Sequence, residues 1–531
     1  MENATSEALA RSASLCWTNQ PSVLHVTLGV IFIYACKILF SGNDKIRAPV
    51  VGYRAWWEPG WLVGLRFFRN SVDMVNEGYQ KYNASMFSIR RNDSNILVIP
   101  SRHVEYLRNL PEDEISGMKA HIKNMSGPYT NTEILLESNL ASRVLQQRLT
   151  PNLASAVPNM KDELDYALEV EVPDCQDEWV SVSVHDIILR IISRVSARVF
   201  VGPSACRNEE WLFTCVHYTE NVYEVIILLR MLPPSLHTLV APLLPAYWRI
   251  RRDQATARRI LCPMVQARRA EQESNGSIAK PDDLLQWMMD MGDANETRND
   301  KLAHRQLVLS LAAIHTSSMA TTHAVYDLCA HPEYLEPLRA ELQSTLEETG
   351  GWSKPIIPRL RKLDSFLKES QRLNPPAIVA FNRIVCTPTR LPDGTALPAG
   401  THFCMASSAT QNDPANLPHN PKRDLDANNP YDPTAFDPFR WAHLRDDPAH
   451  PENAHRFQFA TTDSSSLHFG HGRFACPGRF YASQQIKMIF AHLLLLYDFK
   501  YPEGQKRPRN LCSDENLYPD PAARVMIRRR R

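Results

Sequence analysis

Hydrophobic and polar positions recur with helical periodicity along most of the chain. This periodicity predicts helices over residues 101–109, 160–171, 183–201, 302–330, 356–373 and 478–496. The stretch 209–260 is rich in Leu, Val, Ile, Tyr and Trp but is broken by prolines, which predicts two helices joined by an apolar loop. Alternation typical of strands is confined to short segments, around Asn92-Asp93-Ser94 and before a turn on Asp393-Gly394. We therefore expect a mainly α fold with small β-sheets.

A long apolar run lies near the N-terminus. Residues 23–40 read VLHVTLGVIFIYACKILF, which is about the length of a membrane-spanning helix. A cleaved signal peptide fits less well, because Glu2, Glu7 and Arg11 leave the preceding segment without a basic start. A buried core helix is a weaker alternative. The flank after the run is net basic, so the positive-inside rule places the body of the chain in the cytosol.

These observations predict a single-pass protein of the endoplasmic reticulum membrane. The expected parts are a short lumenal tail (1–21), a transmembrane anchor helix (22–41) and one large cytosolic domain (42–531). Among the Asn-x-Ser/Thr triplets, only Asn3 would then meet the glycosylation machinery. The apolar stretch 209–260 is compatible with core packing, with contact to the membrane, and with gating of an apolar pocket.

Composition excludes several classes of protein. With 44% hydrophobic and 22% charged residues, the chain builds a large core and is not globally disordered. A net charge of +1 gives no support for binding nucleic acid. The 11 cysteines include no CxxC pair, which excludes a zinc ribbon and a thioredoxin-type motif. The sequence also lacks GxGxxG and GxxxxGK[ST], so the common nucleotide-binding folds are excluded.

Candidate chemistry is concentrated in the segment 469–480, which reads FGHGRFACPGRF. Gly470 and Gly472 allow a tight turn and a close approach of the backbone to a flat ligand. Cys476 precedes Pro477, which suits the first position of a helix, so the thiol faces the free N–H groups of a helix start. Such an environment favours the thiolate, and a thiolate on a glycine loop is what haem iron needs as a proximal ligand. A buried, inert cysteine near a turn is the alternative.

This segment resembles the haem-binding loop of the cytochrome P450 family, usually written FxxGxRxCxG. Phe469, Gly472, Cys476 and Gly478 match that pattern, and the resemblance implies that Cys476 is the axial ligand of the iron. At the position where the family has an arginine that contacts a haem propionate, this chain has Phe474. Whether the neighbouring arginine takes over that contact stays open.

Three further segments follow the family's order. Glu369 and Arg372 match its ExxR motif, and their spacing of three puts both side chains on one face of a helix. Arg440, within FDPFRW, resembles the arginine that completes this pair into a buried triad, to which we assign a structural role. Arg383, within FNRI, resembles a strand arginine that meets a haem propionate. Taken alone, Glu369 and Arg372 are equally typical of a surface ion pair.

The predicted helix 302–330 contains an unusual polar switch. After Ala312 and Ala313 it continues with His315, Thr316 and further hydroxyl residues, which are middling helix formers that loosen a helix by bonding back to its carbonyls. A kinked core helix is one interpretation. The other is the family's oxygen-side groove, AGx[D/E]T, in which Thr316 matches the threonine and His315 replaces the acid. This form resembles fungal members related to ent-kaurene oxidase.

The resemblance implies a cytochrome P450 fold and a haem-thiolate monooxygenase that carries haem b (iron protoporphyrin IX). It further implies dioxygen and NADPH–cytochrome P450 reductase as partners, because no flavin-binding or NADPH-binding domain fits in the chain. Thr316, together with water and His315, would deliver protons on the oxygen side. We expect a lipophilic substrate of terpenoid or mixed type, as in fungal secondary metabolism. The expected pocket residues are Ala312, Ala313, Ile378, Val379 and Phe381.

Three alternatives stay open from the sequence. The first is a haem-thiolate isomerase or dehydratase that needs no reductase. The second is a membrane-bound, haem-binding protein without turnover, which the departures at Phe474 and His315 keep open. The third is an unrelated enzyme that uses Cys476 as a nucleophile, although it leaves Glu369, Arg372 and Arg440 without an explanation.

Overall fold

The computed structural model describes residues 46, 48–82, 85–274, 280–352, 356–418, 420, 432 and 434–530. The predicted lumenal tail, the anchor helix and Asn3 lie outside these residues, so all three stay predictions. Among the helices in the described ranges, none has both the length and the apolar character needed to cross a membrane. Residues from Ala48 onward form one compact unit.

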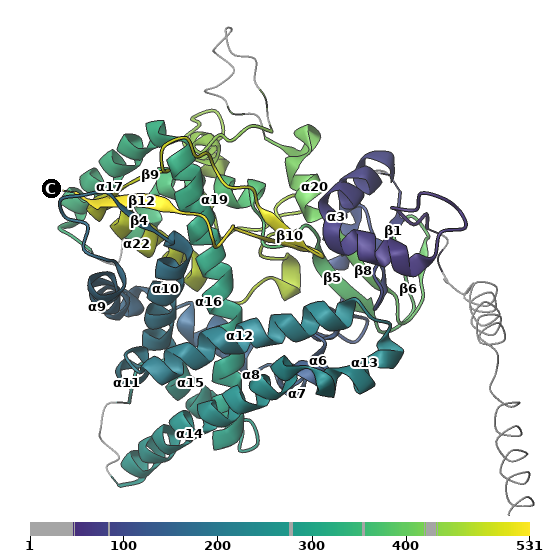
Figure 1. Cartoon of the computed structure of the whole chain (residues 1–531), viewed down its shortest axis with the longest axis horizontal. Helices are drawn as coiled ribbons and strands as arrows, with labels where there is room; N and C mark the ends of the chain where they lie inside the picture. The colour runs from purple at the N-terminus through teal and green to yellow at the C-terminus, as the bar shows by residue number, and fades with distance from the viewer. Residues whose placement is uncertain are drawn as a thin grey trace, which may run out of the picture. The chain divides into compact units, whose positions relative to one another are not determined.

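A long central helix, α16 (Asn299–Ala330), organises the fold, and the other long helices pack around it (Figure 1). Their first turns are capped by polar side chains, since Ser183 accepts a hydrogen bond from the Asp186 N–H and Asn208 accepts one from the Trp211 N–H. The helices that pack against α16 are α10 (Val184–Phe200), α12 (Glu209–Arg230), α14 (Pro245–Ser274) and α22 (Arg479–Leu496), and α9 (Leu153–Glu171) packs against α10.

Fourteen further helices complete the helical part of the described chain. They are α3 (Gly60–Tyr82), α4 (Val104–Leu107), α5 (Gly117–Asn124), α6 (Gly127–Thr130), α7 (Ile134–Glu137), α8 (Leu140–Val144), α11 (Pro203–Cys206), α13 (Pro234–Val240), α15 (Leu284–Met291), α17 (Leu335–Thr349), α18 (Ile356–Arg359), α19 (Arg361–Leu373), α20 (Ser407–Asn412) and α21 (Arg440–Arg445). Single turns of 3-10 or π helix occur at η1 (Ser101–His103), η2 (Leu145–Leu149), η3 (Ala241–Leu243), η4 (Pro332–Tyr334), η5 (Pro414–Asn416), η6 (Pro451–His455) and η7 (Gly472–Phe474).

The strands form small sheets, as predicted. β1 (Phe87–Arg90) and β2 (Asn95–Val98) pair antiparallel, which confirms the hairpin expected around Asn92-Asp93-Ser94. They join a five-stranded sheet in the order β1-β2-β8-β5-β3. Its other strands are β3 (Ile115–Ser116), β5 (Ala380–Val385) and β8 (His402–Met405). The remaining sheets are β4-β12-β9, β10-β11 and β6-β7, built from β4 (Val180–Val182), β6 (Thr389–Arg390), β7 (Ala396–Leu397), β9 (Tyr497–Lys500), β10 (Leu511–Ser513), β11 (Asn516–Tyr518) and β12 (Val525–Arg529).

Two expected helices differ from the structure. The segment 356–373 is not one helix, because Leu360 (ψ 72°) separates α18 from α19. The N–H groups of Lys362 and Leu363 donate to the Glu341 carboxylate of α17, at 2.6 and 2.9 Å, so a tertiary contact caps the start of α19. The stretch 209–260 does contain two long helices, α12 and α14, but the apolar connection between them carries a helix of its own, α13.

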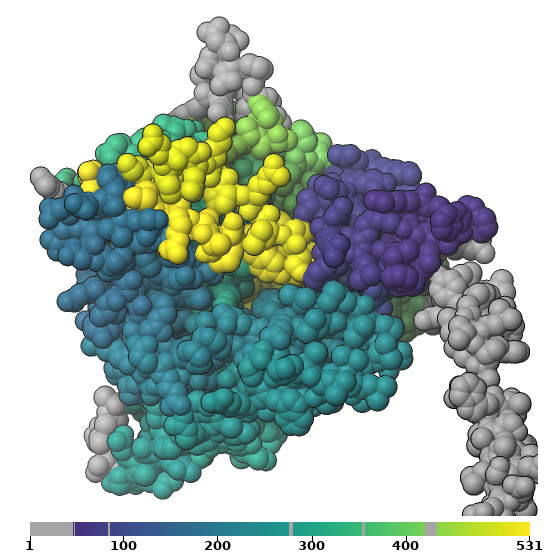
Figure 2. All heavy atoms as spheres, in the orientation of Figure 1, coloured from purple at the N-terminus to yellow at the C-terminus, as the bar shows by residue number. Residues whose placement is uncertain are grey.

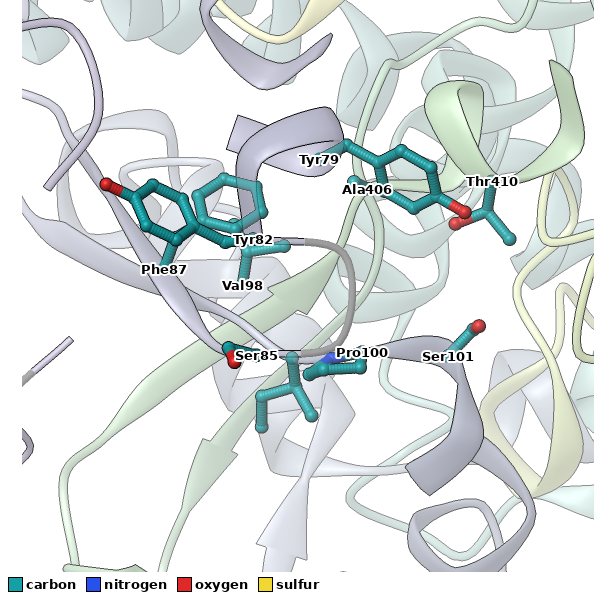
Figure 3. Close-up of a pocket in the computed structure, with 10 residues that line it drawn as sticks. Tyr79, Tyr82, Ser85, Phe87, Val98, Pro100, Ser101, Ala406 and Thr410 are labelled. Carbon is teal, nitrogen blue, oxygen red and sulfur yellow. The ribbon is translucent and has the colours of Figure 1, made fainter. Parts of the chain in front are cut away.

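A second, smaller core lies where α3 meets the β1–β2 hairpin and the end of β8. A small pocket opens at this junction, where Tyr79 of α3 lies beside Thr410 of α20 (Figure 3). The Tyr79 hydroxyl donates to Asp413 at 2.8 Å, which ties α3 to the end of α20. The pocket therefore marks a packing junction between elements that are far apart in the sequence. Its lining residues are Tyr79, Tyr82, Ser85, Phe87, Val98, Ile99, Pro100, Ser101, Ala406 and Thr410.

A buried ion network joins α19 to the start of α21. The Glu369 carboxylate accepts from Arg372 at 2.7 and 3.0 Å and from Arg440 at 3.4 Å, and all three side chains are at most 3% exposed. Trp441 donates its indole N–H to the same carboxylate at 3.0 Å, and the backbone N–H of Asp437 donates at 3.1 Å. Because each charge is hydrogen-bonded, the network tolerates burial and holds the two segments together.

Replacing Glu369 by Gln should destabilise the protein severely. The variant removes the buried negative charge that Arg372 and Arg440 share, a loss of about 3 to 5 kcal/mol in the free energy of unfolding. Urea unfolding followed by tryptophan fluorescence measures this loss.

Glu336→Gln is the matched control for this substitution. Glu336 pairs with Arg339 at the same spacing of three and the same distance of 2.7 Å, but it is 74% exposed. Its loss should therefore cost less than about 1 kcal/mol. Equal unfolding midpoints for Glu369→Gln and Glu336→Gln would contradict the structural role of the buried triad.

Candidate functional site

The loop that presents Cys476 is held by its own backbone. Gly470 and Gly472 adopt positive φ values of 68° and 72°, which suit glycine. The Cys476 N–H donates to the Phe469 carbonyl at 2.7 Å and closes the loop. A Cβ atom on Gly472 would come within 2.9 Å of the Arg108 carbonyl oxygen, so only glycine allows this close approach. The predicted tight turn is therefore present, and Cys476 sits half-buried at its end.

The start of the following helix differs slightly from the expectation. α22 begins at Arg479 with Gly478 as its N-cap, so Pro477 lies before the helix and not at its first position. Burial raises the pKa of the Cys476 thiol, while the N–H groups of Gly478 and Arg479 oppose that shift. In the protein alone, burial outweighs the helix start. A metal ion overcomes this, because a thiol that ligates a metal is deprotonated.

Arg383 supplies a second feature that fits a haem. The side chain is 4% exposed, and its Nε and Nη2 groups have no hydrogen-bond partner. Burial lowers the pKa of Arg383 to about 10, so the guanidinium stays charged at neutral pH. A buried cation with two unsatisfied donors fits an anionic group such as a haem propionate. The thiol of Cys476 and the orphaned donors of Arg383 are therefore the groups that would hold a haem, through its iron and its carboxylate.

Ala312 and Thr316 mark the accessible face of α16. Both side chains are exposed, although their neighbours Leu311, Ile314 and Ser317 are buried. The two residues lie one turn apart on the same face of the helix, and the Thr316 hydroxyl donates to the Ala312 carbonyl at 2.7 Å. Ala313, beside them, is half-buried. A small side chain and a hydroxyl thus border a solvent-accessible space at the middle of the central helix.

His315 is directed toward α12. Its Nε2 lies 3.2 Å from the Val216 carbonyl oxygen, and because that oxygen only accepts, Nε2 carries the hydrogen. Burial lowers the pKa of His315 to about 4, so the imidazole is neutral at pH 7. The structure thus brings Thr316 and His315 to different neighbours, one at the accessible face of α16 and the other at its packing with α12.

The buried network under α19 also reaches the segment that leads into the Cys476 loop. Lys368, the residue before Glu369, donates to the Gln458 carbonyl and to the Ser466 hydroxyl, each at 3.3 Å. α19 therefore holds two separate segments, one through Glu369 and the other through Lys368. Trp441 lies in the FDPFRW segment without a predicted role, and no sequence motif identifies Lys368 as a functional residue.

Three of the expected pocket residues are buried. Ile378 and Val379 are 1% and 2% exposed and pack into the small core with α3 and the β1–β2 hairpin. Phe381 is 3% exposed, and its ring lies against the Arg383 guanidinium. The pairing of β5 with β8 is irregular between Ala380 and Arg383, which includes the position of Phe381. A place for these three residues in a substrate pocket stays a prediction.

The chain matches known proteins over almost its whole length. A family model described as Cytochrome P450 matches residues 52–525. Cytochrome P450 monooxygenase AN1598 of Emericella nidulans is 54% identical over 507 residues, which cover 95% of this chain and 92% of that protein. Ent-kaurene oxidase P450-4 of Gibberella fujikuroi is 42% identical over 510 residues, which cover 96% of this chain and 97% of that protein.

A solved structure agrees with the fold. The retinoic acid-bound cyanobacterial CYP120A1 matches with a TM-score of 0.65 at 20% identity, over 91% of this chain and 99% of that chain. Similarity at this identity shows the fold alone. The family match, however, spans the Cys476 loop, the Glu369 network and α16 together. On this ground the chain belongs to the cytochrome P450 family and is a monooxygenase.

Proposed function

We propose that this monooxygenase oxidises a lipophilic, terpenoid-type substrate of fungal secondary metabolism. The ent-kaurene oxidase relative, alike over nearly the whole chain, supports this class of substrate. Within the site, the observation that carries the proposal is the exposed pair Ala312 and Thr316, which offers a small apolar surface beside one hydroxyl. Electrons come from NADPH–cytochrome P450 reductase, because the sequence contains no nucleotide-binding motif of its own.

The cytochrome P450 family implies a haem-thiolate iron cofactor, and we propose haem b. When bound, the haem supplies the activation of dioxygen that places one oxygen atom in the substrate. Cys476 provides the thiolate ligand, and Arg383 binds a propionate. Phe469, Gly472 and Gly478 shape the loop around the cysteine. Glu369, Arg372 and Arg440 keep the supporting segments in place and take no part in the chemistry.

Thr316 is the proposed proton donor on the oxygen side. Its hydroxyl hydrogen is held by the Ala312 carbonyl, so the oxygen can accept a hydrogen bond from a water in the adjoining space. A hydroxyl that both accepts and donates passes protons between water and the reacting group. For His315 we propose a holding role, since its Nε2 hydrogen is bound to the Val216 carbonyl of α12 and the neutral ring lacks the acidic second proton of imidazolium at pH 7.

Exposed apolar side chains support a location at the membrane. One group lies at the start of α3, where Trp56 is 94% exposed, and another around α13, where Leu243 is 78% exposed. The two segments adjoin, because Asn92 lies against Gly64 of α3 and donates to the Met231 carbonyl just before α13. Figure 2 shows the purple α3 region bordering the teal α12–α13 region. Clustered exposed aromatic and aliphatic residues are typical of surfaces that contact lipid.

The substrate proposal is tested by turnover in membranes that contain this protein and a reductase. With ent-kaurene and related cyclic terpenoid hydrocarbons, NADPH and isotopically heavy dioxygen, we expect a first hydroxylated product that has gained one heavy oxygen atom. Mass spectrometry measures that gain. Oxidation of fatty acids alone would contradict the substrate class. A rearranged product formed without NADPH would instead indicate an isomerase.

Replacing Thr316 by Ala should uncouple NADPH consumption from product formation. Removing the hydroxyl takes away the group that delivers protons, so product per NADPH should fall about tenfold or more. The ratio is measured from NADPH absorbance and product yield in the same reaction.

Two variants serve as controls for the Thr316 substitution. Ser318→Ala removes a hydroxyl with the same 2.7 Å bond to a helix carbonyl, but Ser318 is fully buried, so coupling should stay at the wild-type level. His315→Gln keeps a donor for the Val216 carbonyl and should also stay coupled. If Thr316→Ala forms as much product per NADPH as wild type, the relay role of Thr316 is refuted. If His315→Gln forms less product per NADPH, His315 takes part in proton delivery.

A further inference from the structure

Two aromatic rings, those of Phe381 and Phe474, pack against the Arg383 guanidinium, and together they form an aromatic clamp. The guanidinium carbon lies 4.1 Å from the centre of the Phe381 ring and 4.7 Å from the centre of the Phe474 ring. A cation over an aromatic face is attracted by the ring, and more strongly where water is excluded. Phe474 belongs to the Cys476 loop and Phe381 to β5, so the clamp joins the loop to the sheet.

The surrounding backbone is shaped to allow this clamp. Phe381 has a φ of 57°, a conformation that bulky residues rarely adopt and that costs about 1 to 3 kcal/mol. Gly117, at the start of α5, lies so near that a Cβ atom would come within 2.8 Å of the Phe474 ring and 3.2 Å of the Arg383 guanidinium. The strained backbone of Phe381 and the missing side chain of Gly117 both make room for the packing around Arg383. This indicates that the fold fixes the position of the Arg383 guanidinium.

The free edge of the guanidinium selects the chemistry of its ligand. Arg383 Nη1 donates to the Asn382 carbonyl at 2.8 Å, whereas Nε and Nη2 have no partner. These two nitrogens form one side of the planar fork, and two parallel N–H groups on one side match the two oxygens of a carboxylate. The charge of Glu112 acts on Arg383, but no carboxylate of the described residues forms a salt bridge with it, so this edge is available to the carboxylate of a ligand.

Phe474 stands where the family pattern has an arginine. The neighbouring Arg473 is exposed, and its backbone N–H donates to the Arg108 carbonyl at 3.4 Å. The loop thus does not bring a second buried cation to this place. It brings a ring that immobilises the cation already present on β5.

We propose that Phe474 is a positioning residue that, with Phe381, clamps Arg383 so that its Nε–Nη2 edge binds a haem carboxylate. This inference rests on the proposed haem-binding function and deepens it. The loop lacks the arginine of the family pattern and supplies no other cation in its place. We propose that it compensates by fixing the orientation of the Arg383 side chain. A fixed guanidinium loses less conformational entropy when it forms the two hydrogen bonds.

Haem release tests the clamp without reference to turnover. The purified full-length holoprotein is mixed with excess apomyoglobin as haem acceptor, and the rate of transfer is followed by absorbance. Phe474→Leu removes the ring and should release haem about three- to thirtyfold faster than wild type. Phe474→Tyr keeps the ring and should release it at the wild-type rate. Arg383→Lys keeps the charge but not the fork, and should also release haem faster, by about threefold or more.

Two further arms make the result specific. Trp179→Leu removes a ring that lies 4.3 and 4.7 Å from Lys500 and Arg528 on the β4-β12-β9 sheet, and it should leave haem release unchanged. Haem dimethyl ester has methylated carboxylates, which cannot pair with Arg383 as ions. Wild type and Phe474→Leu should therefore release this ester at the same rate. If Phe474→Leu releases haem at the wild-type rate, the clamp is overturned. It is also overturned if Phe474→Leu releases haem and haem dimethyl ester faster than wild type by the same factor. A wild-type protein that binds no haem would overturn the proposed function itself.

Discussion

The buried carboxylate of Glu369 is the interaction on which the site depends. Arg372 and Arg440 are both buried, and neither guanidinium is tolerated there without a nearby negative charge. Glu369 bonds both guanidinium groups and so ties α19 to the start of α21, while the adjacent Lys368 ties α19 to the segment that leads into the Cys476 loop. Side chains of α19 therefore hold the segments that flank the loop, and the loop itself is closed by its own backbone.

Two groups of the protein, the Cys476 thiol and the Arg383 guanidinium, are left without the partners that their chemistry favours. Burial keeps the Cys476 thiol protonated in the protein alone, and the buried Arg383 keeps two donors without partners. The proposed haem would resolve both imbalances at once, because its iron would favour the thiolate and its propionates would satisfy the guanidinium. The aromatic clamp of Phe381 and Phe474 adds direction to this second contact.

Local patterns in the sequence were sufficient for the helical framework, the β1–β2 hairpin and the loop of Cys476, because periodicity and glycine positions encode them directly. The break at Leu360 could not be predicted, since it depends on a cap from Glu341 on another helix. The direction of His315 toward Val216 and the burial of Ile378 and Val379 also arise from tertiary packing. Phe474 was recognised as a departure, but its role is visible only beside Arg383, which lies far from it in the sequence.

The central claim is that Cys476 ligates a haem iron as a thiolate. The absorption spectrum of the reduced, carbon monoxide-bound protein tests it most directly, with Cys476→Ser as the comparison. The account predicts the red-shifted Soret band of thiolate-ligated iron in the wild type and its absence in Cys476→Ser. A folded wild-type protein that binds haem without that band, or a Cys476→Ser variant that retains it, would contradict the account.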